Sequence, residues 1–439
     1  MKDATYKSYL ISVLLVILAL NFTDRWALGL ALENIKADLA LSDTQLGFVS
    51  GIAFALFYSV MGIPIARWAD RGNRVAIISL TAAVWSVMVA LCGVAGSFKQ
   101  LLLIRIGVGI GEAGCIPPAL SLIADYFTRT ERPRAVSVYM QGVTVSLVIG
   151  YFVAGWLNEF YGWRAMFVVV GLPGLAVAAL GAFSLREPRR HQSQTAASWS
   201  DPPTLKDVCL TLWTNATFRH LLYAYSVLSF FNYGILQWTP TFFVRSFGLK
   251  TGDLGTWFAI MYGLSGLLGT YWGGEWASRR AARNERLQLR AFAIMVFVSA
   301  LFGAFMYLPA LAPNRYWAFG WLGVSTMVGI MINGPMFSVL QTLVPERMRA
   351  MSIALVYLFA NLIGMGLGPW ATGAMSDALR PWFGEESLRY ALLAICPGYL
   401  WVSWHFWQAG RTVSRDLTTV LEADTRDLCD EEGTHASFP

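Results

Sequence analysis

The sequence predicts an all-α polytopic membrane protein in which twelve transmembrane helices form two pseudo-symmetric halves of six. Three observations predict this fold class. Hydrophobic residues make up 56% of the 439 residues and charged residues only 14%, whereas a typical soluble protein has about 25% charged residues. Twelve largely apolar runs are each long enough to cross a bilayer, which takes about 20 residues. Short motifs also recur between the first and second parts of the chain.

The apolar runs set the expected helices in chain order. Several contain Gly or Pro, which are more frequent in transmembrane helices than in soluble ones. The predicted helices span 9–32, 44–66, 75–96, 99–127, 133–157, 163–185, 218–244, 252–277, 290–310, 315–343, 349–378 and 387–409.

The distribution of Lys and Arg predicts how these helices are oriented. Of the 33 Lys and Arg residues, 23 lie in the N-terminus, the even-numbered loops and the C-terminal tail, and eight lie in the loops on the opposite side. The remaining two, Arg25 and Arg105, lie within helices. Because cytoplasmic loops are enriched in Lys and Arg, we predict a multi-pass protein of the cell (inner) membrane with both termini in the cytoplasm.

Two short repeats divide the chain. E-R-P-R-A-V-S at 131–137 recurs as E-R-M-R-A-M-S at 346–352, and W-A-D-R at 68–71 recurs as W-A-S-R at 276–279. The nearly equal offsets indicate a duplicated six-helix unit. We therefore predict an N-terminal half at 1–186, a cytoplasmic linker with an interfacial helix at 187–217, a C-terminal half at 218–410 and a disordered cytoplasmic tail at 411–439. The linker has an amphipathic pattern. Four apolar residues would share one face of its helix: Leu205, Val208, Leu212 and Trp213.

Composition argues against several classes of function. The net charge of +6 is spread through short loops, whereas nucleic-acid binding needs basic residues gathered on one surface. The five Cys and four His residues show no disulfide or metal-ligand spacing, so we expect no cofactor and no metal. No catalytic constellation is recognisable, so we expect no enzyme activity.

Four charged residues lie inside the predicted membrane helices away from their ends, where each costs roughly 2.5–3.5 kcal/mol. Asp24 and Arg25 are adjacent, so they point about 100° apart and each needs another partner. Arg105 and Glu112 lie two turns apart on one face of the fourth helix. The simplest arrangement places all four around one hydrated cavity in the N-terminal half.

These charges have two interpretations. They form a structural network that joins helices, or they bind and couple the substrate. We favour a functional role for Asp24 and Glu112 as the proton-coupling pair, because intramembrane carboxylates typically mark ion or proton pathways. Arg25 or Arg105 would hold an anionic head group through its planar fork. Asn21 and Glu112 complete the substrate-binding residues expected on this wall.

The C-terminal half carries neutral polar residues in its helices instead, among them Asn333 and Asn361. Aromatic residues gather in its first helix, including Phe230 and Tyr233. A cavity that is charged on one wall and neutral or aromatic on the other suits an amphiphile, whose head would meet the first half and whose tail would meet the second. The alternative is that these aromatic side chains serve only packing.

The topology and several motifs resemble the major facilitator superfamily along the chain to about residue 410. The loop after the second helix reads A-R-W-A-D-R-G-N-R at 66–74, which is similar to that family's G-x-x-x-D-R-x-G-R-R, with Ala66 in place of Gly and a spacing one residue shorter. The resemblance implies a cytoplasmic gate formed by Asp70, Arg71 and Arg74, with Arg134 as a partner.

Three further elements resemble the Spinster subfamily. They are N-F-x-D-R at 21–25, S-D-T-Q-L-G-F at 42–48 and R-x-x-x-G-x-G-E-A at 105–113. This resemblance implies proton-linked movement of lysophospholipids or sphingosine-1-phosphate. We expect alternating access as the mechanism. The expected partners are this amphipathic small-molecule substrate, protons and membrane lipids, and we expect the protein to be a monomer. The alternatives are a proton-coupled symporter of small organic anions, a polytopic membrane enzyme and a ligand sensor.

Overall fold

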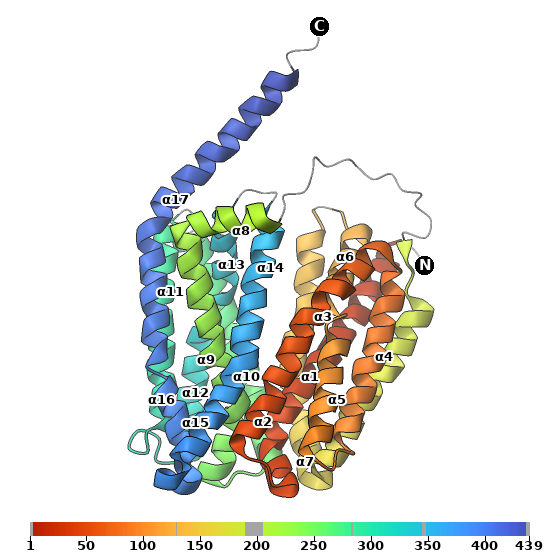
Figure 1. Cartoon of the computed structure of the whole chain (residues 1–439), viewed down its shortest axis with the longest axis vertical. Coiled ribbons are helices and arrows are strands. Elements are labelled where there is room, and N and C mark those ends of the chain that lie inside the picture. Colours follow the sequence, from red (N-terminus) through yellow and green to blue (C-terminus); the bar gives the residue numbers. More distant parts are fainter. Residues whose placement is uncertain (1–2, 129, 189–204, 282–283, 345–347, 436–439) are drawn as a thin grey trace.

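The computed structural model describes residues 3–128, 130–188, 205–281, 284–344 and 348–435. These residues form helices and connecting turns, with no strand among them. The helices stand side by side as two groups, one from each half of the chain (Figure 1). The start of α1 and the end of α17 mark one side of the molecule, which we call the terminal side, and the opposite side is called distal.

The first group contains the helices before the linker. They are α1 Asp3–Leu39, α2 Asp43–Ser50, α3 Ile52–Arg71, α4 Arg74–Cys92, α5 Phe98–Glu112, α6 Ile116–Tyr126 and α7 Arg132–Ser184. The last of these contains 53 residues and makes two passes, because Gly162 inside it has φ +78° and interrupts the helical path. Glycine adopts such a positive φ readily, whereas other residues rarely do.

The second group follows the short helix α8, Leu205–Thr214, which lies across the terminal side (Figure 1). Its members are α9 Ala216–Phe247, α10 Thr251–Arg280, α11 Glu285–Tyr307, α12 Arg315–Ile330, α13 Asn333–Thr342, α14 Arg349–Phe359, the π-helix η3 Ala360–Leu367, α15 Gly368–Phe383, the short 3₁₀ turn η4 Gly384–Glu386, α16 Ser387–Ile395 and α17 Gly398–His435.

These elements give the predicted twelve passes. Eight stretches of the described chain are long and apolar enough to span a membrane, and two of them, Arg132–Ser184 and Met351–Thr418, are long enough for two passes each. The long helices α9 and α10 supply the remaining two passes. The predicted all-α fold of two six-helix halves is therefore confirmed.

Several passes predicted as continuous helices are interrupted. The second pass breaks at Gly51 between α2 and α3, the fourth at 113–115 between α5 and α6, and the tenth at 331–332 between α12 and α13. The eleventh pass contains the π-helix η3. Broken helices at membrane depth are tolerated where they are buried in protein or line a cavity, and in transporters they mark binding sites. Breaks of this kind therefore indicate a candidate binding region in these passes.

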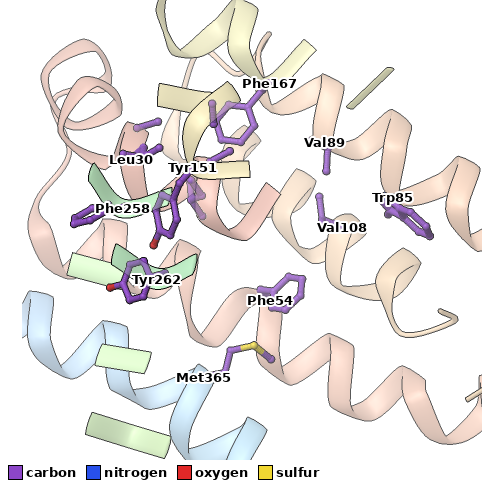
Figure 2. Close-up of a cluster of buried hydrophobic side chains, with 14 of the residues drawn as sticks. Leu30, Phe54, Trp85, Val89, Val108, Tyr151, Phe167, Phe258, Tyr262 and Met365 are labelled. Carbon is purple, nitrogen blue, oxygen red and sulfur yellow. The ribbon is translucent and has the colours of Figure 1, made fainter. Parts of the chain in front are cut away.

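The halves meet most closely toward the distal side. A Cβ added to Gly47 of α2 would lie 2.4 Å from the carbonyl oxygen of Pro369, and one added to Gly255 of α10 would lie 2.2 Å from that of Tyr151. Only glycine permits such close backbone approach. Figure 2 shows the hydrophobic cluster that continues this contact, with Tyr151 of α7 beside Phe258 and Tyr262 of α10. Backbone contact and aromatic packing together close the distal side.

The end of the chain differs from the prediction of a disordered tail from residue 411 onward. The helix α17 continues to His435. Asp416 is buried, and its carboxylate accepts hydrogen bonds from the backbone N–H and the hydroxyl of Thr217 at 2.8 Å each. Because Thr217 lies in the first turn of α9, Asp416 satisfies an N–H group that the helix itself leaves unpaired. This contact extends the folded C-terminal half beyond residue 410.

Candidate functional site

The four intramembrane charges form two buried ion pairs between the first and fourth passes. Arg105 of α5 donates to the Asp24 carboxylate of α1 at 2.6 Å, and both side chains are about 98–99% buried. Arg25 donates through Nε and Nη2 to Oε2 of Glu112, at 3.0 and 2.5 Å. Adjacent residues on α1 thus take separate partners on α5, as their angular separation predicts. The roles assigned to these residues remain predictions.

The Arg25 guanidinium lies where the two halves face each other. Its centre is 4.1 Å from the ring centroid of Phe22 and 4.8 Å from that of Phe54. Its Nη1 also donates to the sulfur of Met365 in η3, at 3.7 Å. In Figure 2 the Met365 side chain points toward Phe54. Arg25 is therefore held by a carboxylate and aromatic faces of its own half and also contacts a residue of the other half.

Polar atoms in this cluster remain without hydrogen-bond partners among the described residues. They are both amide atoms of Asn21, one oxygen each of Asp24 and Glu112, and Nε of Arg105. Buried polar groups are normally satisfied, and leaving one unpaired costs about 1–3 kcal/mol. The cluster therefore has unused bonding capacity for water, protons or a polar ligand. A cavity of about 30 Å³, lined by both Arg25 and Arg105, adjoins it.

The substrate-binding residues predicted in the C-terminal half lie in different places. Tyr233 lines the small cavity beside Arg25, and Asn333 lines a separate, larger cavity. Phe230 packs edge-on against Phe231 at a centroid distance of 5.3 Å, and Asn361 lies in η3 outside both cavities. The structure thus brings Tyr233 to the charged cluster, while Asn333 lies apart from it.

The larger cavity lies between the fifth pass of the N-terminal half and several passes of the C-terminal half, and has a volume of about 420 Å³. Residues from the fifth, seventh, eighth, ninth, tenth and twelfth passes line it, and none of these lining residues is charged. Leu236 lines both this cavity and the small one beside Arg25, so the two are neighbours. The sequence predicted a neutral wall in the C-terminal half but did not predict a cavity beside this wall.

A second ionic cluster, which the sequence analysis missed, joins the halves on the distal side. The buried Asp43 at the start of α2 accepts from Arg245 of α9 at 2.8 Å, from Lys36 at 2.6 Å and from Ser376 of α15 at 2.7 Å. Arg245 also pairs with Glu33. Asp43 lies in the S-D-T-Q-L-G-F motif, but only the fold shows that Arg245 and Ser376 of the other half are among its partners.

Asp377 reinforces the same junction. Its carboxylate accepts from the backbone N–H groups of Asp43 and Thr44 at 3.1 and 2.7 Å. The first N–H groups of a helix have no partner within the helix and carry partial positive charge. A carboxylate from α15 therefore holds the beginning of α2, so opening the distal side requires these bonds to break.

The gate residues predicted on the terminal side show a different arrangement. Arg74 is fully buried and pairs with Asp125 at 2.7 Å and with Glu187. Asp125 belongs to the N-terminal half, and Glu187 directly follows the predicted end of that half. Arg71 and Arg134 are exposed. The side chain of Asp70 lies outside the described residues. A gate between the halves at these residues stays a prediction.

Glu131, in the repeated motif, ties the terminal end of α1 to the start of α7. It accepts from Lys7 at 2.9 Å. The hydrogen bond from Lys7, together with that from the Thr128 backbone, lowers the pKa of Glu131 to about 2. The carboxylate therefore stays charged at physiological pH.

Comparisons with known proteins agree with this architecture. The model of the Major Facilitator Superfamily matches residues 14–369. An MFS-type efflux pump of Mycolicibacterium smegmatis is 30% identical over 412 residues, covering 93% of each chain. A "Probable L-galactonate transporter" of Escherichia coli is 25% identical over 390 residues, covering 86% of this chain and 83% of that protein.

Among solved structures, a bacterial homologue of the human lysosomal transporter Spinster, in an inward-facing and unoccupied conformation, is similar with a TM-score of 0.81. It is 30% identical, and the match covers 94% of this chain and 98% of that one.

Proposed function

The chain belongs to the Major Facilitator Superfamily, and we propose that it is a secondary active, proton-coupled transporter of amphipathic lipids with an anionic or zwitterionic head. Lysophospholipids and sphingosine-1-phosphate-like molecules have this chemistry. The observation that carries the proposal is the Arg25–Glu112 pair, which faces the other half beside a neighbouring uncharged cavity. The similarity to a Spinster homologue supports the same substrate class.

Proton coupling follows from the charge balance of the cluster. Two arginines and two carboxylates sum to zero, and Arg25 directs two of its hydrogen bonds to a single oxygen of Glu112. An anionic head that bonds to Arg25 would take the place of Glu112. A buried carboxylate without a cation is strongly disfavoured, so Glu112 would take up a proton. Substrate binding and protonation of Glu112 are thereby linked. Asp24 and Arg105 form a second ion pair that can undergo the same exchange.

Transport would proceed by alternating access around this cluster. The contacts of Asp43, Asp377 and Gly47 close the distal side in this structure. We propose that both termini are cytoplasmic, that the site therefore communicates with the cytoplasm in this state, and that the protein acts as a monomer. Rocking one half against the other would exchange the distal contacts for contacts at the terminal side.

The second candidate is a proton-coupled symporter of small organic anions. The relative named as an L-galactonate transporter favours it, and Arg25 and Arg105 would bind a carboxylate as well as a phosphate. A small hydrophilic anion would use the cavity beside Arg25 without needing the larger neutral cavity. The two candidates therefore differ in whether an apolar tail is required.

Uptake into proteoliposomes distinguishes them. Proteoliposomes that contain the purified protein would be given a radiolabelled lysophospholipid or L-galactonate under an imposed pH gradient. Protein-free liposomes are the control. We expect gradient-dependent movement of the lysophospholipid and no movement of L-galactonate. Movement of L-galactonate alone would overturn the lipid proposal and establish the organic-anion alternative.

A further inference from the structure

Arginines gather on the terminal side where α11 packs against α17 (Figure 1). Arg286 and Arg290 lie in the first two turns of α11, and Arg411 lies on α17. A Cβ added to Gly410 would lie 3.2 Å from Cγ of Arg290 and 3.4 Å from the carbonyl oxygen of Arg286. We call this place the α11–α17 seam. No carboxylate of the described residues forms an ion pair with these arginines, Glu285 at the start of α11 included.

The corresponding place in the N-terminal half has its own carboxylates. Arg74 is the first residue of α4, and it pairs with Asp125 and with Glu187, which follows the sixth pass. The third and sixth passes of the first half correspond to the ninth and twelfth passes of the second. Positive charge near the beginning of a helix is unfavourable unless an anion compensates it. The described residues supply that anion in the first half and none in the second.

The arginines of the α11–α17 seam are accessible to a ligand. The guanidinium centre of Arg290 lies 5.1 Å from the ring centroid of Trp407, which positions it against α17. Arg290 is partly exposed, and Arg286 and Arg411 are exposed. Arg411 donates to the side chain of Gln408 at 3.4 Å, which is a long hydrogen bond. The remaining donors can therefore bind an anion from outside the protein.

The position of the seam in the membrane indicates which anion this is. Arg290 begins the predicted ninth pass and Trp407 lies near the end of the predicted twelfth, at the level where head groups meet hydrocarbon. The face of α11 then continues into the membrane with the exposed side chains of Ile294, Phe297 and Leu301, which are three or four residues apart and so share one face. A molecule with an anionic head and acyl chains matches both parts of this surface.

We propose that the α11–α17 seam binds an anionic phospholipid of the surrounding membrane, with its phosphodiester at Arg286, Arg290 and Arg411 and its acyl chains along the apolar face of α11. Guanidinium groups bind phosphate oxygens in pairs, and basic pockets between membrane helices bind anionic head groups. The seam is separate from the charged cluster at Arg25. The lipid is therefore a bound partner of the C-terminal half, whichever substrate the protein transports.

Native mass spectrometry of the full-length protein in detergent with added lipid tests this proposal. The probes are dioleoylphosphatidylglycerol, which is anionic, and dioleoylphosphatidylcholine, which has the same acyl chains and a zwitterionic head. Arg290→Gln removes one charge of the seam. Arg132→Gln is the matched control, because it removes an exposed arginine from the first turn of α7, on the terminal side of the other half.

We expect the wild type to bind phosphatidylglycerol at least about tenfold more tightly than phosphatidylcholine. Arg290→Gln should weaken phosphatidylglycerol binding about fivefold, and the double variant Arg286→Gln with Arg290→Gln about 25-fold. Arg132→Gln should change this binding by less than about twofold. Equal affinity of the wild type for the two lipids, or equal losses in Arg290→Gln and Arg132→Gln, would overturn the proposed site.

Two further measurements separate a lipid site from a site for a soluble anion and from a folding defect. A large excess of sn-glycerol 1-phosphate, which lacks acyl chains, should leave phosphatidylglycerol bound, and complete displacement would overturn the lipid as the ligand. Thermal unfolding shows whether each variant is folded. If Arg290→Gln is not folded, Arg411→Gln changes an exposed side chain of the same seam, and unchanged phosphatidylglycerol binding in that variant would overturn the proposal.

Discussion

The fourth and tenth passes occupy equivalent places in the two halves, and their side chains differ in a way that separates two tasks. Arg105 and Glu112 are the eighth and fifteenth residues of α5, and the corresponding residues of α12 are Leu322 and Gly329. The first two form ion pairs with α1, whereas the second two line the uncharged cavity. Both passes break just after these positions. Duplication therefore preserved a helix with a break, while one copy provides charge and the other provides space.

The largest effect on stability is expected when Arg105 of α5 is replaced by leucine, the residue at the corresponding position 322 of α12. Arg105→Leu removes the partner of Asp24 and leaves a buried charge unpaired, which costs about 3–5 kcal/mol. We expect a large drop in thermal stability in detergent, and recovery of much of it in the double variant Arg105→Leu with Asp24→Asn. Equal stability of the single and double variants would show that Asp24 does not depend on Arg105.

The reverse exchange tests the neutral half. Leu322→Arg places a charge in a cavity whose lining residues include none of opposite sign, and we expect destabilisation of about 2.5–3.5 kcal/mol. Leu322→Met is the matched control and should cost less than about 1.5 kcal/mol. The measurement is thermal unfolding of both variants, and similar stabilities would contradict an uncharged environment around this position.

The junction between the halves should respond more moderately. Asp43→Asn weakens hydrogen bonds to Arg245 and Lys36 that carry charge on both partners, and such bonds contribute about 1.5–3 kcal/mol. We expect a larger population open at the distal side, seen as longer distances between spin labels at the exposed positions Lys99 and Trp382. Asp253→Asn, at an exposed site on α10, is the control and should leave the distribution unchanged.

The smallest effect is expected on the terminal side. Lys7→Met removes the partner of the exposed Glu131, and surface pairs contribute little, so the melting temperature should fall by no more than about 2 °C. Since the pKa of Glu131 is lowered to about 2, the pair stabilises the fold above the ordinary carboxyl pKa and loses this contribution only as the pH falls toward 2. The shift should be the same at pH 5 and pH 8, and a difference would contradict this pairing.

Apolar length and the repeated motifs were sufficient to predict the fold, because a bilayer requires about 20 apolar residues for each helix. The separate partners of Asp24 and Arg25 could also be predicted, since adjacent helical residues point in different directions. The breaks within passes could not, because the residues around Gly51 and at 331–332 are as apolar as those in continuous helices.

The residues that the sequence analysis missed depend on contacts between distant segments. Asp43 and Arg245 are 202 residues apart, and each was placed in a loop between membrane helices. Trp238, on the predicted aromatic helix, is fully buried and donates to the Pro369 carbonyl at 2.8 Å. Only their contacts in the folded structure distinguish such residues from other residues of the same type in the sequence.

The central claim is that Glu112 exchanges Arg25 for a proton when the substrate binds. The most direct test is lysophospholipid transport in proteoliposomes under an imposed pH gradient, comparing the wild type with Glu112→Gln and with Glu275→Gln, a control carboxylate that pairs with Arg279 on α10. The account predicts that the wild type and Glu275→Gln follow the gradient, whereas Glu112→Gln only equilibrates the lipid. Gradient-driven accumulation that survives in Glu112→Gln would contradict the account.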